Sequence, residues 1–242
     1  IAGDSKQLPP TNFFSSSMDE EDYDEELEVD SEAGNFESIL DEADSVLPER
    51  TLRWHYRSRH EHLIAFSNVK IYNNQLITFP SSIEKAADIG VEYVYVKNGI
   101  YERKGKKINK AEAEKVAELV FEHFKKHPER SLGVVTFSEA QQNAVDAAIR
   151  NKRLQNPGFD HYFNEEKEEP FFVKNLENVQ GDERDAIIFS IGYAKDANGI
   201  MYMNFGPLNR EGGYRRLNVA ITRAKFNVKL VGSIVPTDID LY

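Results

Sequence analysis

The stretch LGVVTFSEAQQNAVDAAIRNK, residues 132–152, holds a strand and a helix in immediate succession. Its first six residues form a continuous apolar run, which is typical of a strand buried within a parallel sheet. Ser138 follows as a helix N-cap with Gln141 three residues later, a capping box that predicts a helix over Glu139 to Lys152. A buried strand that leads directly into a helix is the repeating unit of an α/β protein.

Strands and helices alternate on both sides of this unit. Further strands are predicted at residues 75–79, 91–96, 171–173, 185–191 and 227–231. Helices are predicted near residues 36–47, 59–70, 111–127 and 215–225. Loops are predicted where the sequence is polar or rich in glycine, at residues 97–109, 156–169 and 194–213. The alternation predicts an α/β fold, in which helices cover a parallel sheet.

The segment RRLNVAITRAK, residues 215–225, reads as one short helix. Leu217, Ile221 and Ala224 recur at helical spacing and would form an apolar stripe that packs on the sheet. Arg216 and Arg223 lie seven residues apart, so both guanidinium groups would leave from one neighbouring face. Guanidinium groups form bidentate hydrogen bonds with phosphoryl oxygens, which indicates a phosphate site. A basic surface helix with solvated arginines is the alternative.

The amino-acid composition narrows the classes of protein to which the chain could belong. The 242 residues suffice for one or two domains, and 40% hydrophobic residues with 11% aromatics indicate a globular fold. The absence of cysteine excludes disulfides, thiolate catalysis and cysteine-ligated zinc. No apolar run approaches the roughly 18 residues that span a bilayer, and no signal peptide is visible. We therefore expect a cytoplasmic protein without membrane contact. Because the chain begins at Ile1, we expect a fragment of a longer protein.

The negative charge is concentrated in one segment. Met18 to Ser45 contains 14 acidic residues and no Lys or Arg. The chain has a net charge of −11 and this segment contributes −14, which leaves +3 for the rest. A mildly basic remainder neither demands nor forbids a polyanionic partner. Residues 15–31 are serine-rich and then acidic, and we expect a poorly ordered linker there.

Polar residues stand where a ligand could be held. In IAGDSKQLPPT, residues 1–11, a strand end leads into a loop with Asp4 and Gln7, and open α/β sheets bind ligands beyond strand ends. In VQGDERD, residues 179–185, a glycine lets the backbone approach a phosphate or sugar. Tyr56 and Arg57 precede a predicted helix and could meet a base and a phosphate. Ordinary packing of the tyrosine beside a surface arginine is the alternative.

Four polar signatures occur in fixed order: GDSKQLPPT, LRWHYRSRHEHLIAFSN, VKNLENVQGDERDAIIFS and RRLNVAITRAK. With them the chain resembles superfamily 1 helicases of the 5′→3′ branch that contains the nonsense-mediated decay helicase. There they carry motifs III, IV, V and VI, and the resemblance extends from Ile1 to about Gly232. It implies a RecA-like parallel sheet with helices on both faces, a P-loop NTPase fold that here lacks its own P-loop.

The resemblance also implies a domain organisation. Residues 1–14 would be the tail of a first RecA-like domain, carrying motif III, and residues 15–47 an acidic linker with an amphipathic helix. Residues 48–242 would be the second RecA-like domain. The implied function is that of the second motor domain of an ATP-dependent nucleic-acid helicase or translocase.

Roles for individual residues at an ATP site follow from the resemblance. Gln7 would sense the γ-phosphate or the attacking water, and Arg57 and Arg223 would reach the γ-phosphate as arginine fingers. The residues implied in nucleotide binding are Tyr56 beside the adenine, Gly181, Glu183 on the ribose, and Arg216.

The first RecA-like domain of the full-length chain would hold Mg²⁺. No G-x-x-x-x-G-K-[ST] loop occurs in this sequence. The run ILDEAD, residues 39–44, imitates the metal-binding Asp-Glu motif of an ATPase, but its apolar residues have helical spacing. We therefore predict no metal ligand in this chain, and no ATP hydrolysis by the chain alone.

Single-stranded nucleic acid is the implied partner, with DNA favoured over RNA. Ser67, Asn68, Thr136 and Asn175 are candidates for contact with its backbone. The sequence departs from the family pattern at two of them. A common Thr-Pro-Tyr is Thr-Phe-Ser at residues 136–138, and Asn175 replaces a usual Ser or Thr.

Two other functions are alternatives to that of a motor domain. A non-catalytic nucleic-acid-binding or scaffold module could retain the fold, but it would have no use for paired arginines at the γ-phosphate. A nuclease domain would need a cluster of carboxylates with a catalytic lysine, which the predicted folded part does not present.

Overall fold

The computed structural model describes residues 1–8, 38–81 and 87–239. The chain divides into two compact units, Ile1–Leu52 and Arg53–Tyr242. In the first unit, α1 (Ile39–Val46) begins at Ser38, whose hydroxyl accepts a hydrogen bond from the Asp41 amide. The expected acidic linker lies outside the described residues.

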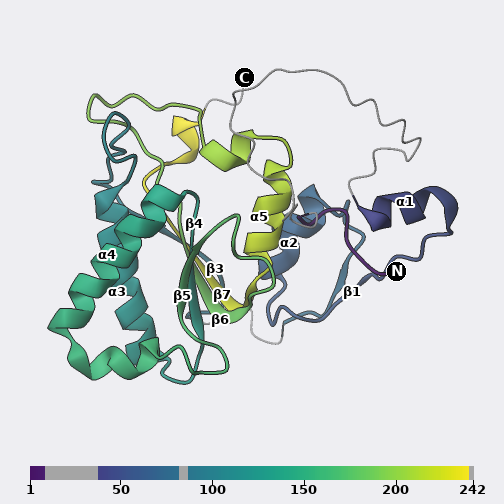
Figure 1. The fold of residues 1–242 in the computed structure, drawn as a ribbon, viewed down its shortest axis with the longest axis horizontal. Helices are drawn as coiled ribbons and strands as arrows, with labels where there is room; N and C mark the ends of the chain where they lie inside the picture. The colour runs from purple at the N-terminus through teal and green to yellow at the C-terminus, as the bar shows by residue number, and fades with distance from the viewer. Residues whose placement is uncertain (9–37, 82–86, 240–242) are drawn as a thin grey trace, which may run out of the picture. The chain divides into compact units, whose positions relative to one another are not determined.

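The second unit is built on a five-stranded parallel sheet (Figure 1). Its order is β3-β7-β6-β4-β5, and the bounds are β3 (Gly90–Tyr95), β4 (Leu132–Thr136), β5 (Phe172–Asn175), β6 (Arg184–Ser190) and β7 (Ala224–Gly232). Every residue of β4 is buried, as its continuous apolar sequence predicts. A separate two-stranded parallel sheet pairs β1 (Trp54–His55) with β2 (Ile77–Thr78), and β1 was not predicted.

Helices cover both faces of the five-stranded sheet, which confirms the predicted fold class. Figure 1 shows α3 (Lys110–Lys126) and α4 (Glu139–Gln155) on one side. On the other side lie α2 (His62–Lys70) and α5 (Gly213–Ile221). The core between the sheet and the α3–α4 pair is apolar and includes Val116, Val120, Phe124, Val134, Val145, Ile149 and Ile188.

The connections contain three short 3₁₀ helices: η1 (Pro157–Phe163), η2 (Gly206–Asn209) and η3 (Pro236–Asp238). The first lies within the predicted loop at residues 156–169. It forms because its aromatic rings pack on α3, with Phe159 5.3 Å from Phe121 and Phe163 5.5 Å from Phe124 between ring centroids.

The capping box predicted at α4 is half formed. The Ser138 hydroxyl accepts from the Gln141 amide at 3.3 Å, as expected of an N-cap. The Gln141 side chain does not return to the N-cap. Its Oε1 accepts from the Asn109 amide at 2.8 Å, and its Nε2 donates to the Asn109 carbonyl and to the Ser190 hydroxyl. Gln141 is buried, and it joins α4 to the start of α3 and the end of β6.

The helix predicted over residues 215–225 ends earlier than expected. Here α5 stops at Ile221, and β7 begins at Ala224. The Thr222 hydroxyl donates to the carbonyls of Asn218 and Val219, which occupies groups of the last helical turn. The buried apolar residues of α5 are Val219 and Ala220, whereas Leu217 and Ile221 are only half-buried. The expected apolar stripe is therefore wrong, because pairing with β6 draws Ala224 into a strand.

Candidate functional site

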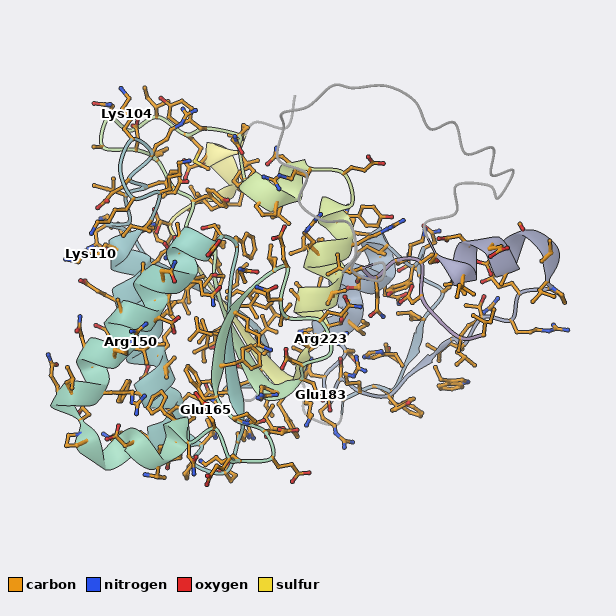
Figure 2. All side chains as sticks on the ribbon, in the orientation of Figure 1. Lys104, Lys110, Arg150, Glu165, Glu183 and Arg223 are labelled. Carbon is orange, nitrogen blue, oxygen red and sulfur yellow. The ribbon has the colours of Figure 1, made fainter. Side chains whose placement is uncertain are left out.

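The candidate site lies at the edge of the sheet where β6 and β7 begin. Glu183 immediately precedes β6, and Arg223 immediately precedes β7. These two strands pair side by side, and the Arg184 amide donates to the Arg223 carbonyl at 3.1 Å. Figure 2 shows Glu183 and Arg223 at the same end of the sheet, below α5. Residues 40 positions apart in the sequence are thus neighbours.

Arg57 reaches the same edge from the segment that leads into α2. Its Nε lies 3.2 Å from Oε2 of Glu183. The Arg59 amide donates to the Lys225 carbonyl at 2.8 Å, which holds this segment alongside β7. Arg57 and Arg223 therefore share one patch at the rim of a single sheet.

Arg223 is held rigidly by its own neighbours. Its side chain donates from Nε to the Val219 carbonyl at 2.8 Å and from Nη2 to the Thr222 hydroxyl at 3.1 Å. Only 6% of the residue is exposed. Burial lowers the pKa of Arg223, the positive charge of Arg57 lowers it further, and Glu183 raises it. An arginine remains charged under such conditions. Arg223 is thus a preorganised cation.

Glu183 joins two cations. Besides Arg57, its carboxylate lies 3.5 Å from Nζ of Lys225, which also pairs with Glu169 at 2.5 Å. The side chains of Arg57 and Glu183 are 41% and 42% exposed. Ion pairs this exposed contribute under about 1 kcal/mol. The Arg57–Glu183 pair can therefore open at little cost when a more highly charged anion approaches.

Gly181 stands in the turn just before Glu183. Its φ of +89° is a conformation that side chains disfavour, and a Cβ atom there would meet nothing within 4 Å. Lys174 holds this turn, because its Nζ lies 2.6 Å from the Asp182 carboxylate. A ligand could approach the backbone closely at this point. Tyr56, next to Arg57 in the chain, is 79% exposed.

Arg216 makes contacts of its own, different from those of Arg57 and Arg223. It lies on α5, where its side chain pairs with Glu177 at 3.4 Å and donates to the Glu211 carbonyl at 3.2 Å. The expectation that Arg216 and Arg223 leave one helix from the same face is wrong, because α5 ends before Arg223.

Gln7 belongs to the first unit. Its Nε2 donates to Oδ2 of Asp4 at 2.9 Å, and its amide donates to the Asp4 carbonyl. The Lys6 amide donates to the other carboxylate oxygen of Asp4. Asp4 thus organises the turn that presents Gln7.

Of the four residues predicted to contact nucleic acid, three are buried and Asn68 is half-buried. Ser67, Thr136 and Asn175 are buried. Thr136 and Asn175 are register partners at the carboxyl ends of β4 and β5. Their side chains bond to the Ser138 carbonyl and to Gln142. The Asn68 amide group bonds the Leu76 backbone in both directions. The hydrogen-bonding groups of Asn68, Thr136 and Asn175 thus hold neighbouring backbone or side chains, and contact of the four residues with nucleic acid stays a prediction.

Lys225 is a functional candidate that the sequence pattern did not single out. Read as a helix, residues 215–225 place Arg223 and Lys225 on different faces. Read as the entry into a strand, the spacing of two puts both on one side. The spacing of Arg223 and Lys225 was therefore visible in the sequence, but it was interpreted with the periodicity of a helix instead of that of a strand.

Residues 1–8, 38–81 and 87–239 contain no group of three or more His, Cys, Asp or Glu side chains placed to hold a metal ion. Within those ranges, no helix combines the length and the apolar character that a bilayer span requires.

Comparisons with known proteins relate this geometry to a family. A family model described as an AAA domain matches residues 34–235. Uncharacterized ATP-dependent helicases of Mycoplasma pneumoniae and Mycoplasma genitalium are each 40% identical over 242 residues, covering 95% of this chain and 20% of the relative. A regulator of nonsense transcripts 1 homolog of Neurospora crassa is 30% identical over 127 residues, 52% of this chain and 10% of that protein.

Among solved structures, the C-terminal domain of a possible DNA helicase from Lactobacillus plantarum aligns with a TM-score of 0.42 and 16% identity. The alignment covers 75% of this chain and 90% of that one. The chain spans about one fifth of the length of the Mycoplasma relatives that it matches.

Proposed function

Because the chain belongs to the AAA domain family and carries the C-terminal signatures of superfamily 1 helicases, we propose that it is the second motor domain of an ATP-dependent nucleic-acid helicase or translocase. The observation that carries the proposal is the convergence of Arg57 and Arg223 on one patch beside Glu183. Paired guanidinium groups on the rim of a RecA-like sheet suit the γ-phosphate of a nucleotide held by another domain.

The two arginines would contribute differently to hydrolysis. Phosphoryl transfer depends on positioning and on positive charge at the transferring oxygens, and an arginine supplied from outside the phosphate loop contributes about 10³–10⁵ in rate. Arg223 is already fixed by Val219 and Thr222, so little ordering would be needed in the transition state. Arg57 would exchange Glu183 for the γ-phosphate, which would free the Glu183 carboxylate to bind the ribose.

Mg²⁺ would be held elsewhere. The described residues do not fit a magnesium site, since no cluster of three carboxylate or imidazole ligands occurs among them. We propose that a first RecA-like domain supplies both the phosphate loop and the metal ligands, and that Gln7 couples it to this one. Single-stranded nucleic acid is the proposed partner.

The test uses a protein that joins this chain to its phosphate-binding domain. We expect Arg223→Ala to reduce nucleic-acid-stimulated ATP hydrolysis by about 10³-fold or more, with nucleic-acid affinity nearly unchanged. Steady-state phosphate release and oligonucleotide anisotropy measure the two quantities. Arg150→Ala, at an exposed position on α4, is the matched control and should leave both unchanged.

Because Arg223 is buried, its loss could also disturb folding. Arg57→Ala removes an exposed side chain instead and should give the same separation of hydrolysis from binding. Equal loss of both activities in Arg223→Ala would indicate a structural residue. Unchanged hydrolysis in both variants would favour a non-catalytic nucleic-acid-binding or scaffold module.

A further inference from the structure

The two oxygens of the Glu183 carboxylate have different cationic partners. Nε of Arg57 lies 3.2 Å from Oε2, and Nζ of Lys225 lies 3.5 Å from Oε1. In the proposed function Arg57 leaves Glu183 for the γ-phosphate, which frees Oε2. Lys225 then remains beside Oε1, so the carboxylate keeps one cation and offers one free oxygen to a ribose hydroxyl. Hydrogen bonds to an ionised acceptor are roughly twice as strong as those between neutral groups.

Lys225 is itself held from two sides. Its Nζ lies 2.5 Å from Oε1 of Glu169, and its carbonyl accepts from the Arg59 amide at 2.8 Å. Only 23% of its side chain is exposed. The hydrogen bond to Glu169 raises the pKa of Lys225, whereas burial lowers it. The ammonium group is therefore charged at neutral pH and has little freedom to move.

The Glu169 carboxylate is tied to the sheet in turn. Its Oε2 accepts from the Ser131 hydroxyl, which accepts from the Asp185 amide at 2.9 Å. The next residue in the chain, Pro170, is fixed as well, because its carbonyl accepts from Nε and Nη2 of Arg184 at 2.9 and 2.6 Å. The carboxylate that supports the lysine is thus anchored where β4 and β6 begin. All of these residues belong to the second unit.

A direct role for Lys225 at the phosphate fits these contacts less well. Its ammonium group lies between the carboxylates of Glu169 and Glu183, so much of its charge is already compensated. The Arg223 guanidinium instead donates to a carbonyl and a hydroxyl, which are neutral and do not cancel its charge. The contacts of Lys225 suit the holding of a carboxylate better than the binding of an anion.

We infer that Lys225 is a positioning residue of the nucleotide site. It holds Oε1 of Glu183 while Oε2 accepts from a ribose hydroxyl, and Glu169 holds Lys225. The inference rests on the proposed function for the presence of a nucleotide at this edge. It goes beyond that function because it makes recognition of the ribose depend on three charged side chains, from the turn before β6, from β7 and from the loop before β5.

The test uses the protein that joins this chain to its phosphate-binding domain, and it compares ATP with 2′,3′-dideoxy-ATP, which lacks both ribose hydroxyls. Steady-state phosphate release in the presence of single-stranded nucleic acid gives kcat/KM for each nucleotide. We expect the wild type to prefer ATP by about tenfold, since a hydrogen bond to a charged group contributes roughly that much. Lys225→Met should reduce the preference to about twofold, mainly through a higher KM for ATP. Lys225→Arg keeps a cation and should restore the preference.

Two further variants separate positioning from general effects of charge. Glu183→Ala should abolish the preference for ATP, and adding Lys225→Met to it should change the preference no further, because the lysine acts through this carboxylate. Lys115→Met is the matched control, since it removes an exposed lysine that pairs with Glu118 at 3.0 Å on α3. It should leave the preference unchanged. Circular dichroism and thermal unfolding show whether each variant is folded.

Three results would overturn the inference. The first is a wild-type protein that uses both nucleotides equally well. The second is a folded Lys225→Met variant that keeps the wild-type preference. The third is a Lys225→Met variant in which kcat falls equally for both nucleotides, which would place the lysine at the phosphate.

Failure of the inference is distinguishable from failure of the motor role. If Arg223→Ala hydrolyses ATP like the wild type, the proposed function fails, and the inference fails with it. If Arg223→Ala is inactive while Lys225→Met keeps the preference for ATP, the motor role stands and only the role of Lys225 is wrong.

Discussion

At the scale of single residues, Glu112 is a buried acid in the described part of the chain that titrates near neutrality. Its carboxylate accepts from Asn109, Ser233 and the Gly192 amide and contacts the Ser190 hydroxyl. Burial raises the pKa of Glu112 to about 7, although these hydrogen bonds act in the opposite direction. The proton is therefore held more tightly in the folded chain than in the unfolded one.

This raised pKa predicts a pH dependence of folding stability. The stabilisation from Glu112 is fully present below its unfolded pKa near 4.5 and is lost as the pH rises through about 7. The full loss is on the order of 3 kcal/mol, and about 2 kcal/mol of it falls between pH 5.5 and pH 8. Urea unfolding of the wild type at pH 5.5 and pH 8 measures it, with Glu112→Gln as the comparison. The glutamine variant should lack this pH dependence.

Glu112→Gln should also be less stable than the wild type at pH 5.5. One carboxylate oxygen accepts from the Gly192 amide and the other from Asn109 Nδ2, so an amide nitrogen at either place faces an N–H donor. Such an unsatisfied buried group costs about 1–3 kcal/mol. A glutamine variant that keeps the wild-type slope between pH 5.5 and pH 8 would contradict the assignment of the titration to Glu112.

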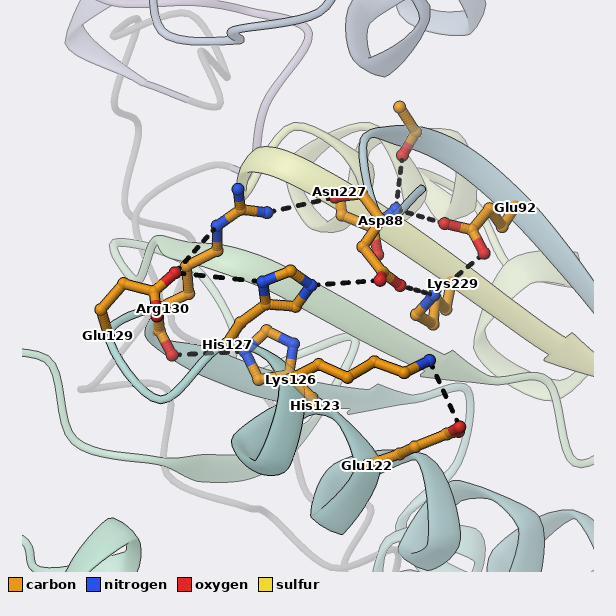
Figure 3. Close-up of polar contacts among 11 residues, drawn as sticks. Asp88, Glu92, Glu122, His123, Lys126, His127, Glu129, Arg130, Asn227 and Lys229 are labelled. Carbon is orange, nitrogen blue, oxygen red and sulfur yellow. Dashed lines mark hydrogen bonds and ion pairs between the residues drawn. The ribbon is translucent and has the colours of Figure 1, made fainter. Parts of the chain in front are cut away.

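At the scale of elements, Asp88 connects β3, β7 and the end of α3. Figure 3 shows its carboxylate between Lys229 of β7, at 2.5 Å, and His127 after α3, at 3.1 Å. Lys229 also pairs with Glu92 of β3 at 2.9 Å. Burial alone would raise the pKa of Asp88, but the hydrogen bonds from Lys229 and His127 lower it to about 2. The ionised carboxylate thus stabilises the edge of the sheet.

We expect Asp88→Asn to destabilise the chain by about 2 kcal/mol at pH 7. Asn tolerates the φ of +59° at this position, so the substitution tests the charge rather than the backbone. A depressed pKa contributes stability above pH 3.8 that is lost as the pH falls through about 2. The difference in urea unfolding free energy between variant and wild type should therefore shrink towards pH 2.

The control for the Asp88 substitution is an exposed ion pair on α3. Glu118→Gln removes the contact of Glu118 with Lys115, at 3.0 Å on the surface of α3. Exposed helix pairs contribute about 0.3–0.5 kcal/mol, so this variant should be almost as stable as the wild type. Equal destabilisation by the two substitutions would mean that Asp88 acts as an ordinary surface charge.

At the scale of the whole molecule, the proposed motor role assigns part of the catalytic machinery to another domain. The sequence contains no phosphate-binding loop, and the described residues contain no metal cluster. We therefore expect the pure 242-residue chain to show no magnesium-dependent ATP hydrolysis above background in a phosphate-release assay. Turnover that is abolished by Arg57→Ala would refute this and would place a complete ATPase site within the chain.

The sequence by itself determined the α/β alternation, the buried character of β4 and the N-cap of α4. These depend on local periodicity and on side chains within a few residues of one another. The order of the four polar signatures was also sufficient to indicate the family, since it requires no knowledge of strand order.

Only the tertiary structure decided which of the polar residues meet. Strand order β3-β7-β6-β4-β5 places β6 beside β7, which brings Glu183 to Arg223 and Lys225, and the segment before α2 adds Arg57. The same pairing ended α5 at Ile221 and separated Arg216 from Arg223. Local pattern could not predict this, because the hydrogen bonds that pull Ala224 into a strand come from residues 40 positions away.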